Sequence, residues 1–578
     1  MIKVLFYHSV DLFNQSFDFS YERDGIKTVY PALASVYIKT YIELNYPDIA
    51  DKIHWMLPIQ IEKTNEELIE IINTEKPDLF CTGHYVWNHT GLMEQLKEIK
   101  NKIPSSTKLV VGGPHIDVAQ NPDFFKKYPF VDYAIYASGE VAFADLATSI
   151  LKNKKLIAFN TSNIAWWDKE KQQQVVADWK YVSHSKVSPF IYNEEYFSNI
   201  IKDIFNQGYQ VSMSYELTRG CPYACTFCDW NSGFSNKVSR RKGTFRDEID
   251  LFQKLGIKNI MLSDANVGQY EEDIELVEYI LEKNLKEKAG FKIDGNFSKL
   301  KKDNVLKMFH IIGQINTNGR TEPTGIGFML SVQDINKEVL DNVDRPDIGW
   351  EDHLKMAYEL RDAFPNITTK IQLIQGLPGQ SLQSWRHTLA EVAKHKLVLI
   401  PFLHTLLPSS PAYLNPEYSK KWKPTYSNSI RYTADHSFFR GNFMSSCISF
   451  SEKDTVEMSV LANLYVTLSY FGFFRPDIEF DTERVVDAFL KTKFYQGLID
   501  NLWTNWKERD SYYFTVDIDL NEALYSACEY TYAGSKWCLS QNLKRIILGT
   551  LPQTERIKFF KNRNIKLPPS LQKIVEIN

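Results

Sequence analysis

Three cysteines stand close together near the middle of this 578-residue chain, at Cys221, Cys225 and Cys228. The alternation of apolar and polar residues from Val211 to Glu216 predicts a β-strand just before them. The thiols should therefore lie on a loop at the carboxyl end of that strand. Thiolates on one tight loop can converge on a soft metal centre. Iron–sulfur clusters usually take four cysteines, and this loop supplies three, so one iron is left open to bind a substrate.

The spacing Cys-x-x-x-Cys-x-x-Cys, with the aromatic Phe227 before the last cysteine, resembles the cluster loop of the radical S-adenosylmethionine (SAM) superfamily. The resemblance implies a four-iron, four-sulfur cluster on the three cysteines, whose open iron chelates SAM and whose electron cleaves it to a 5′-deoxyadenosyl radical. The alternatives are a zinc knuckle or three unrelated buried thiols. Zinc sites usually pair cysteines as Cys-x-x-Cys with a fourth ligand nearby. No cysteine or histidine lies between Cys228 and His310.

Composition limits the remaining classes of protein. The chain is 44% hydrophobic and 24% charged, as is ordinary for a soluble globular protein, and its net charge of −4 gives no global basic field for nucleic acid. We expect the locally basic run at residues 237–242 to be a solvated loop. No stretch of apolar residues is long enough for a membrane span or a signal peptide. Clustered cysteines argue against a secreted disulfide framework, so we expect a cytoplasmic protein.

The first 150 residues alternate strand and helix signals. Strands separated by segments of helix length predict an α/β fold with a doubly wound, Rossmann-like parallel sheet. Ligands of such sheets bind at the carboxyl ends of the strands. Three turns should lie at that edge, at residues 83–88, 112–115 and 138–140.

These segments together resemble the cobalamin-binding domain that precedes many radical SAM domains. The matching motifs are Pro77-Asp78-Leu79, Gly112-Gly113-Pro114-His115, and Asp132-Tyr133 followed by Gly139-Glu140. The resemblance implies that residues 1–150 form a cobalamin-binding domain. The cobalamin contacts it implies are Tyr85, Val86, Trp87, Asn88, Gly112, Gly113, Pro114, His115, Gly139 and Glu140.

One family motif is absent from this region. Many cobalamin domains carry Asp-x-His-x-x-Gly, whose histidine ligates cobalt from below, and no such string occurs here. We therefore expect cobalamin to bind without a histidine below the metal. A bulky group would then cover that face, and the turn containing Trp87 is the candidate. An ordinary core aromatic is the equal alternative for Trp87.

Residues 206–415 again alternate strands with helices and resemble a radical SAM domain, a partial (β/α)6 barrel with its chemistry at the carboxyl rim. Polar residues follow the expected strands. The resemblance implies that they hold SAM through hydroxyl, carboxylate, amine and adenine contacts, although several could simply cap strand ends. The implied SAM contacts are Phe227, Asp264, Asn296, Ser331, Gln333, Arg345, Ile374 and Gly376; Asn266 is a further candidate for the SAM amine or the substrate.

Two segments lack this alternation. Residues 151–205 are polar without a clear period, which predicts an irregular connecting segment. Residues 416–578 contain long apolar stretches of helix length, which predict a mostly helical C-terminal domain.

The combined resemblance is to cobalamin-dependent radical SAM enzymes. It implies a C-methyltransferase that moves a methyl group from SAM, by way of methylcobalamin, to an unactivated carbon of a small molecule or peptide. A flavodoxin or ferredoxin would supply electrons. The alternatives are a non-methylating enzyme of this group or a cobalamin-binding regulator. A methylthiotransferase is set aside because its N-terminal domain needs extra cysteines and only Cys81 is present here.

Overall fold

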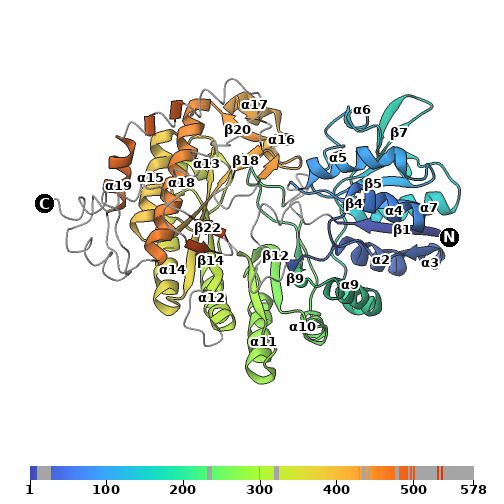
Figure 1. Ribbon diagram of the computed structural model, residues 1–578, viewed down its shortest axis with the longest axis horizontal. Coiled ribbons are helices and arrows are strands. Elements are labelled where there is room, and N and C mark those ends of the chain that lie inside the picture. Colours follow the sequence, from blue (N-terminus) through green and yellow to red (C-terminus); the bar gives the residue numbers. More distant parts are fainter. Residues whose placement is uncertain are drawn as a thin grey trace. The chain divides into compact units, whose positions relative to one another are not determined.

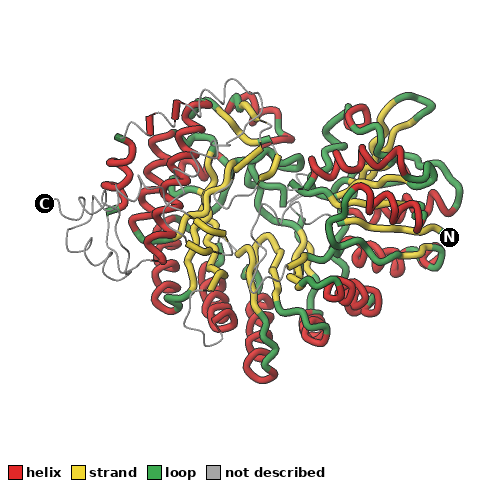
Figure 2. Tube along the Cα trace, in the orientation of Figure 1, coloured by secondary structure: helices red, strands yellow, loops and turns green. Residues whose placement is uncertain are grey.

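The chain folds into two compact units. Unit 1 comprises Met1–Asn318 with Leu406–Glu417, and unit 2 comprises Gly319–Thr405 with Tyr418–Asn578. Figure 1 shows the computed structural model, and Figure 2 distinguishes its helices, strands and loops. It describes residues 1–8, 28–86, 88–230, 237–297, 300–317, 324–427, 430–432, 438–440, 442–474, 481–491, 495–496, 499–500, 530–532 and 535–537.

Unit 1 begins with a seven-stranded sheet in the order β3-β1-β4-β5-β6-β7-β8. The pairs from β3 to β6 are parallel, and β7 and β8 are added antiparallel. The order reverses between β1 and β4, which is where α/β sheets bind ligands. The bounds are β1 (Ile2–Tyr7), β3 (Ile53–Trp55), β4 (Leu79–Gly83), β5 (Lys108–Gly112), β6 (Tyr133–Ile135), β7 (Ile164–Asp168) and β8 (Gln173–Val176).

Alternate residues of each strand point to opposite faces of this sheet, so each face has its own apolar core, and helices cover both. Leu5 and Tyr7 of β1 join the core beneath α4 and α5, whereas Val4 and Phe6 join the core beneath α2 and α7. The predicted doubly wound domain is thus confirmed. The principal helices are α2 (Ala34–Asn45), α4 (Asn65–Glu75), α5 (His89–Ile99) and α7 (Gly139–Leu151); the short elements are α3 (Pro47–Ala50), α6 (Phe124–Lys127) and η1 (Lys100–Lys102).

The segment expected to be an irregular connection is more regular than its sequence indicates. Within residues 151–205, β7 and β8 extend the first sheet, and two helices follow. The edge strand β8 begins with two glutamines and carries no continuous apolar run. The apolar run of β7, from Ile164 to Trp167, is a strand signal that the sequence analysis passed over. The other elements of this segment are η2 (Ala158–Asn160), α8 (Pro189–Tyr192) and α9 (Glu194–Asn206).

A second parallel sheet completes unit 1, in the order β13-β12-β9-β2. Its edge strand β2 comes from the start of the chain, so an N-terminal segment joins the sheet that carries the cysteine loop. The bounds are β2 (Thr28–Val29), β9 (Gln210–Tyr215), β12 (Asn259–Val267), β13 (Lys292–Phe297), α10 (Phe245–Lys254), α11 (Glu271–Glu287), α12 (Lys302–Thr317) and, from the returning segment, α16 (Pro411–Leu414) and the start of α17 (Pro416–Trp422).

Unit 2 holds a parallel three-stranded sheet, β14-β15-β16, with helices between its strands. The six predicted strand–helix units are therefore all present, three in each unit. The bounds are β14 (Thr324–Gln333), α13 (Lys337–Asn342), α14 (Trp350–Ala363), β15 (Ile367–Gln375), α15 (Leu382–Lys394) and β16 (Val398–Leu403).

The described part of residues 416–578 contains two of the expected helices, α18 and α19, and, in addition, antiparallel strand pairs that the sequence did not suggest. The long helix α18 packs against α15 and β16. None of the described helices is long and apolar enough to cross a membrane. The bounds are β17 (Thr425–Ser427), β18 (Ile430–Tyr432), β19 (Phe438–Arg440), β20 (Phe443–Ser446), α18 (Glu452–Phe474), α19 (Thr482–Leu490), β21 (Tyr530–Tyr532) and β22 (Ser535–Trp537).

Candidate active site

The cysteine loop follows β9 and is closed at its base by a small hairpin. Strand β10 (Thr218–Arg219) pairs antiparallel with β11 (Ser239–Arg240), so the chain just before Cys221 is tied to the chain beyond Cys228. Gly220 makes the sharp turn into the loop with φ of +89°. A Cβ there would lie 2.4 Å from the carbonyl oxygen of Lys237, so only glycine fits this close approach.

The three thiols differ in exposure. Cys221 and Cys225 are buried, and Cys228 is half-buried, with its backbone N–H donating to the carbonyl of Cys225. In the described part of the chain, no three His, Cys, Asp or Glu side chains are grouped as ligands of one metal ion. In an iron–sulfur cluster the thiolates ligate separate irons. Three thiols on one loop, none of them in a disulfide, thus suit a cluster of this type.

Asn266 contacts a cysteine of the loop directly. Asn266, at the carboxyl end of β12, donates from Nδ2 to the sulfur of Cys221 at 3.1 Å. Hydrogen bonds to cysteine sulfur are among the factors that set the potential of an iron–sulfur cluster. The sequence suggested a SAM amine or substrate contact for this residue, and the thiol contact is additional to that suggestion.

Asp264 lies beneath the start of the loop. Its Oδ1 accepts from the backbone N–H of Leu217 at 2.8 Å, and its Oδ2 lies 3.8 Å from Arg240. Burial raises the pKa of Asp264 to about 7, although the hydrogen bonds from Thr218 and Leu217 oppose that shift. In this structure the carboxylate therefore supports the backbone leading into the cysteine loop.

The expectation of a solvated basic run at residues 237–242 is wrong for two of its members. Arg240 is 5% exposed in its side chain and pairs with Asp273 at 2.7 Å and Glu272 at 3.1 Å. Arg241 is fully buried and pairs with Glu248, also fully buried, at 3.0 Å. The charges lie inside because the acidic partners Glu248 and Asp273 are buried beside them.

The Arg241 pair belongs to a larger buried network. Tyr215 donates its hydroxyl to Glu248, and the Nη1 of Arg241 lies 3.3 Å from the Nε2 of His184. Burial, together with the charges of Arg219 and Arg241, lowers the pKa of His184 to about 2, so this imidazole is neutral. The network connects β9, which precedes the cysteine loop, to the segment that follows β11.

Of the predicted SAM contacts in unit 1, Phe227 is half-buried on the loop itself, and Asp264 is placed as described above. Asn296 stands on β13, but its side chain lies outside the part that the structure describes.

The predicted SAM contacts in unit 2 gather at the carboxyl ends of two neighbouring strands. At the end of β14, Arg345 donates to the backbone carbonyl of Ser331, whose hydroxyl donates to Gln372 at 2.6 Å. Arg345 also lies 3.6 Å from Asp347. Gln333 ends the same strand in the left-handed region, with φ of +69°. The structure thus brings Ser331, Gln333 and Arg345 to one strand end.

At the end of the next strand, β15, the backbone predicted to meet adenine already has protein partners. The N–H of Gly376 donates to Oε1 of Gln380 at 2.7 Å, and its carbonyl lies 3.1 Å from the Nδ1 of His404. The carbonyl of Ile374 accepts from Gln380 at 2.8 Å. These bonds fix the loop conformation, and sequence spacing alone could not reveal Gln380 or His404.

The predicted cobalamin contacts cluster at the carboxyl edge of the first sheet. Asn88 closes the turn after β4: its Oδ1 accepts from the N–H of Tyr85 at 2.8 Å, and its amide donates to the carbonyl of Gly83 at 3.0 Å. Val86 lies in this turn, and Trp87 lies outside the described residues. The turn borders the point where the strand order reverses.

The next turn, after β5, packs against the first. Gly113 has φ of +111°, and a Cβ there would lie 2.5 Å from the carbonyl oxygen of His84. Gly112, exposed Pro114 and partly exposed His115 complete the turn. The ring of His89 lies 5.2 Å from His84 and 4.8 Å from His115. Burial lowers the pKa of His84 to about 3 and of His115 to about 4, so both rings are neutral.

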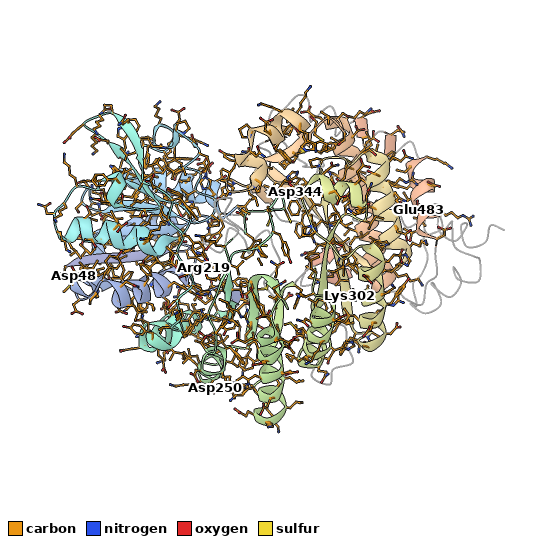
Figure 3. All side chains as sticks on the ribbon, turned by 180° about the vertical axis from the view of Figure 1, so that it is seen from behind. Asp48, Arg219, Asp250, Lys302, Asp344 and Glu483 are labelled. Carbon is orange, nitrogen blue, oxygen red and sulfur yellow. The ribbon has the colours of Figure 1, made fainter. Side chains whose placement is uncertain are left out.

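The third turn leads into α7 through Gly139 and Glu140. Glu140 is 8% exposed, and its carboxylate lies 2.6 Å from Nη1 of Arg219, two positions before Cys221. Figure 3 labels Arg219. Sequence reasoning passed over Arg219, because its partner lies 79 residues away along the chain.

Comparison with known proteins agrees with this geometry. Residues 215–392 match the radical SAM superfamily. The cobalamin-dependent radical SAM methyltransferase TokK of Streptomyces tokunonensis is 28% identical over 389 residues, which cover 66% of this chain and 54% of TokK. The 2-(S-pantetheinyl)-carbapenam-3-carboxylate methyltransferase of Streptantibioticus cattleyicolor is 25% identical over 386 residues, covering 65% of this chain and 53% of that protein.

The chain thus spans about half the length of these curated relatives. Among solved structures, the apo form of the cobalamin-dependent S-adenosylmethionine radical enzyme OxsB aligns with a TM-score of 0.53 at 13% identity, covering 100% of this chain and 83% of that chain. At this identity the alignment supports the fold. The predicted resemblance is therefore confirmed: residues 215–392 are a radical SAM domain, in a chain similar in sequence and fold to cobalamin-dependent radical SAM enzymes.

Proposed function

We propose that this chain is a cobalamin-dependent radical SAM methyltransferase acting on an unactivated carbon. The observation that carries the proposal is the cysteine loop in the same compact unit as a doubly wound sheet of cobalamin-domain type. The names of both curated relatives support methyl transfer over a non-methylating reaction or a regulator.

The roles proposed for individual residues follow from the chemistry of their side chains. When bound, the cluster supplies an electron that cleaves SAM, and cobalamin supplies a carrier for the methyl group. Cys221, Cys225 and Cys228 would hold the cluster. Arg345, Ser331 and Gln333, gathered at one strand end, offer a guanidinium and neutral polar groups for the carboxylate and hydroxyls of SAM.

At the sheet edge, the turns after β4 and β5 offer backbone groups and the glycines Gly83, Gly112 and Gly113 against a flat cofactor. We propose a flavodoxin or ferredoxin as electron donor and a reducing cytoplasm as the location, since the loop cysteines form no disulfide. The first substrate to assay is the pantetheinyl carbapenam carboxylate in the name of one relative.

Isotope transfer tests the proposal. The reconstituted full chain is incubated with methyl-deuterated SAM, a reductant and a candidate substrate. We expect S-adenosylhomocysteine and 5′-deoxyadenosine to accumulate together, and mass spectrometry should find an intact labelled methyl group in the product. A product formed with 5′-deoxyadenosine alone, without label, would establish the non-methylating alternative. Cobalamin binding with no SAM cleavage in the presence of reductant would establish the regulator.

The cobalt environment gives a separate prediction. We propose that cobalamin binds without a histidine below cobalt, because the motif that supplies one is missing. Of the nearby histidines, His84 is fully buried with Nε2 2.9 Å from the Thr82 hydroxyl, so it cannot reach a ligand without moving. Electron paramagnetic resonance of the cob(II)alamin form should therefore show no triplet splitting from a coordinated nitrogen.

The partly exposed His115 is the control residue for this spectrum. His115→Ala should leave the cob(II)alamin signal unchanged. Nitrogen splitting in the parent protein that disappears in His115→Ala would contradict the prediction and assign His115 as the ligand.

A further inference from the structure

A charged contact joins the strand that leads into the cysteine loop to the N-terminal sheet domain. Arg219 donates from Nη1 to Oε1 of Glu140 at 2.6 Å, with the two side chains 24% and 11% exposed. Glu140 stands in the first turn of α7, directly after the third turn of the predicted cobalamin edge. A charge-assisted hydrogen bond at this depth is among the stronger polar contacts in proteins.

A second element of the same domain holds Arg219 from another side. Its guanidinium lies 5.7 Å from the ring of Tyr37 on α2, and α2 packs against α7. A third contact comes from Glu216, at 3.5 Å. The arginine therefore sits between two helices of the first sheet and the strand that leads to Cys221, and its planar fork suits these simultaneous contacts.

The start of the cluster loop has little freedom of its own. Arg219 is followed by Gly220, whose close approach to Lys237 fixes the turn, and then by Cys221. The guanidinium contact therefore anchors the chain two positions before Cys221. By contrast, Glu140 has its carboxylate engaged by Arg219, which leaves it poorly suited to the cobalamin contact that the resemblance implied.

We propose that Glu140 and Arg219 form a positioning pair that fixes the cysteine loop against the N-terminal sheet domain. The pair would keep the cluster at a fixed position relative to the sheet edge at which cobalamin is proposed to bind. The inference rests on the proposed function for the identity of the two cofactors. It assigns to Glu140 a role in placing the cluster loop instead of binding cobalamin.

Iron retention and cobalamin affinity, measured without any substrate, test the pair. The full-chain holoprotein is exposed anaerobically to a ferrous chelator, and hydroxocobalamin is titrated by difference absorbance. In Glu140→Gln we expect chelation to be about tenfold faster, because a charge-assisted contact is lost, while the Kd for cobalamin stays within about twofold of the parent value. The electron paramagnetic resonance spectrum of the reduced cluster with SAM should also change.

Matched variants distinguish the effect of losing the Glu140–Arg219 pair from the effect of losing any carboxylate charge. Glu43→Gln removes a partly buried carboxylate that pairs with Lys39 on α2, and it should leave all three measurements unchanged. Arg219→Lys keeps the positive charge but loses the planar guanidinium, so its rate of iron loss should lie between those of the parent protein and Glu140→Gln. If Glu140→Gln does not accumulate as folded protein, Arg219→Lys carries the test alone.

Two results would overturn the proposal. A Kd for cobalamin raised tenfold or more in Glu140→Gln, with iron loss unchanged, would make Glu140 a cofactor contact. Unchanged iron loss and an unchanged cluster spectrum in both variants would show that the pair positions nothing. Because no step requires turnover, failure of methyl transfer would leave this test intact.

Discussion

Simultaneous replacement of Cys221, Cys225 and Cys228 by alanine should abolish the iron–sulfur cluster and with it all SAM cleavage. The three thiols are the only cysteines on the closed loop between β10 and β11, and a cluster with no protein thiolate has nothing to hold it. Iron and sulfide analysis, visible absorbance and 5′-deoxyadenosine formation should all fall to the level of a blank.

Two controls make this result specific to the loop. Cys81→Ala removes another buried free cysteine, on β4, and should keep full iron content and SAM cleavage. The triple variant should still bind cobalamin, because its sheet edge is untouched. Full iron content in the triple variant would refute the cluster assignment.

The sequence predicted the elements whose signals are local. Buried parallel strands such as Leu79–Gly83 appear as short apolar runs, and turns such as Gly112–His115 carry glycine where the backbone must approach another segment. The cysteine spacing is likewise local, since all three thiols lie on one loop. Family resemblance then added the cofactors, which no local signal contains.

Contacts between distant segments could not be predicted in this way. The basic run at residues 237–242 has the composition of a solvated loop, and its burial depends on Glu248 and Asp273, which are visible only once the chain has folded. Glu140 illustrates the same limit, because a Gly-Glu pair at a helix start is compatible with either a cofactor contact or an ion pair. A single sequence does not show which of these two partners Glu140 has.

Replacement of the fully buried Arg241 by methionine should destabilise the protein severely. Glu248, also fully buried, would lose its cation at 3.0 Å and remain charged or be forced to take up a proton. Breaking one side of a buried pair typically costs about 3–5 kcal/mol, which for a unit as large as unit 1 corresponds to a fall of about 5 °C in the midpoint of thermal unfolding. Circular dichroism of the full chain measures this midpoint.

The double variant Arg241→Met/Glu248→Gln should recover part of the loss, because glutamine removes the unpaired charge but still accepts from the Tyr215 hydroxyl. Arg361→Met, which removes a guanidinium that is 43% exposed, is the control and should shift the midpoint only slightly. If Arg241→Met and Arg361→Met prove equally stable, the buried network does not support the base of the cysteine loop. If the double variant is less stable than Arg241→Met, packing around the arginine stem outweighs its charge.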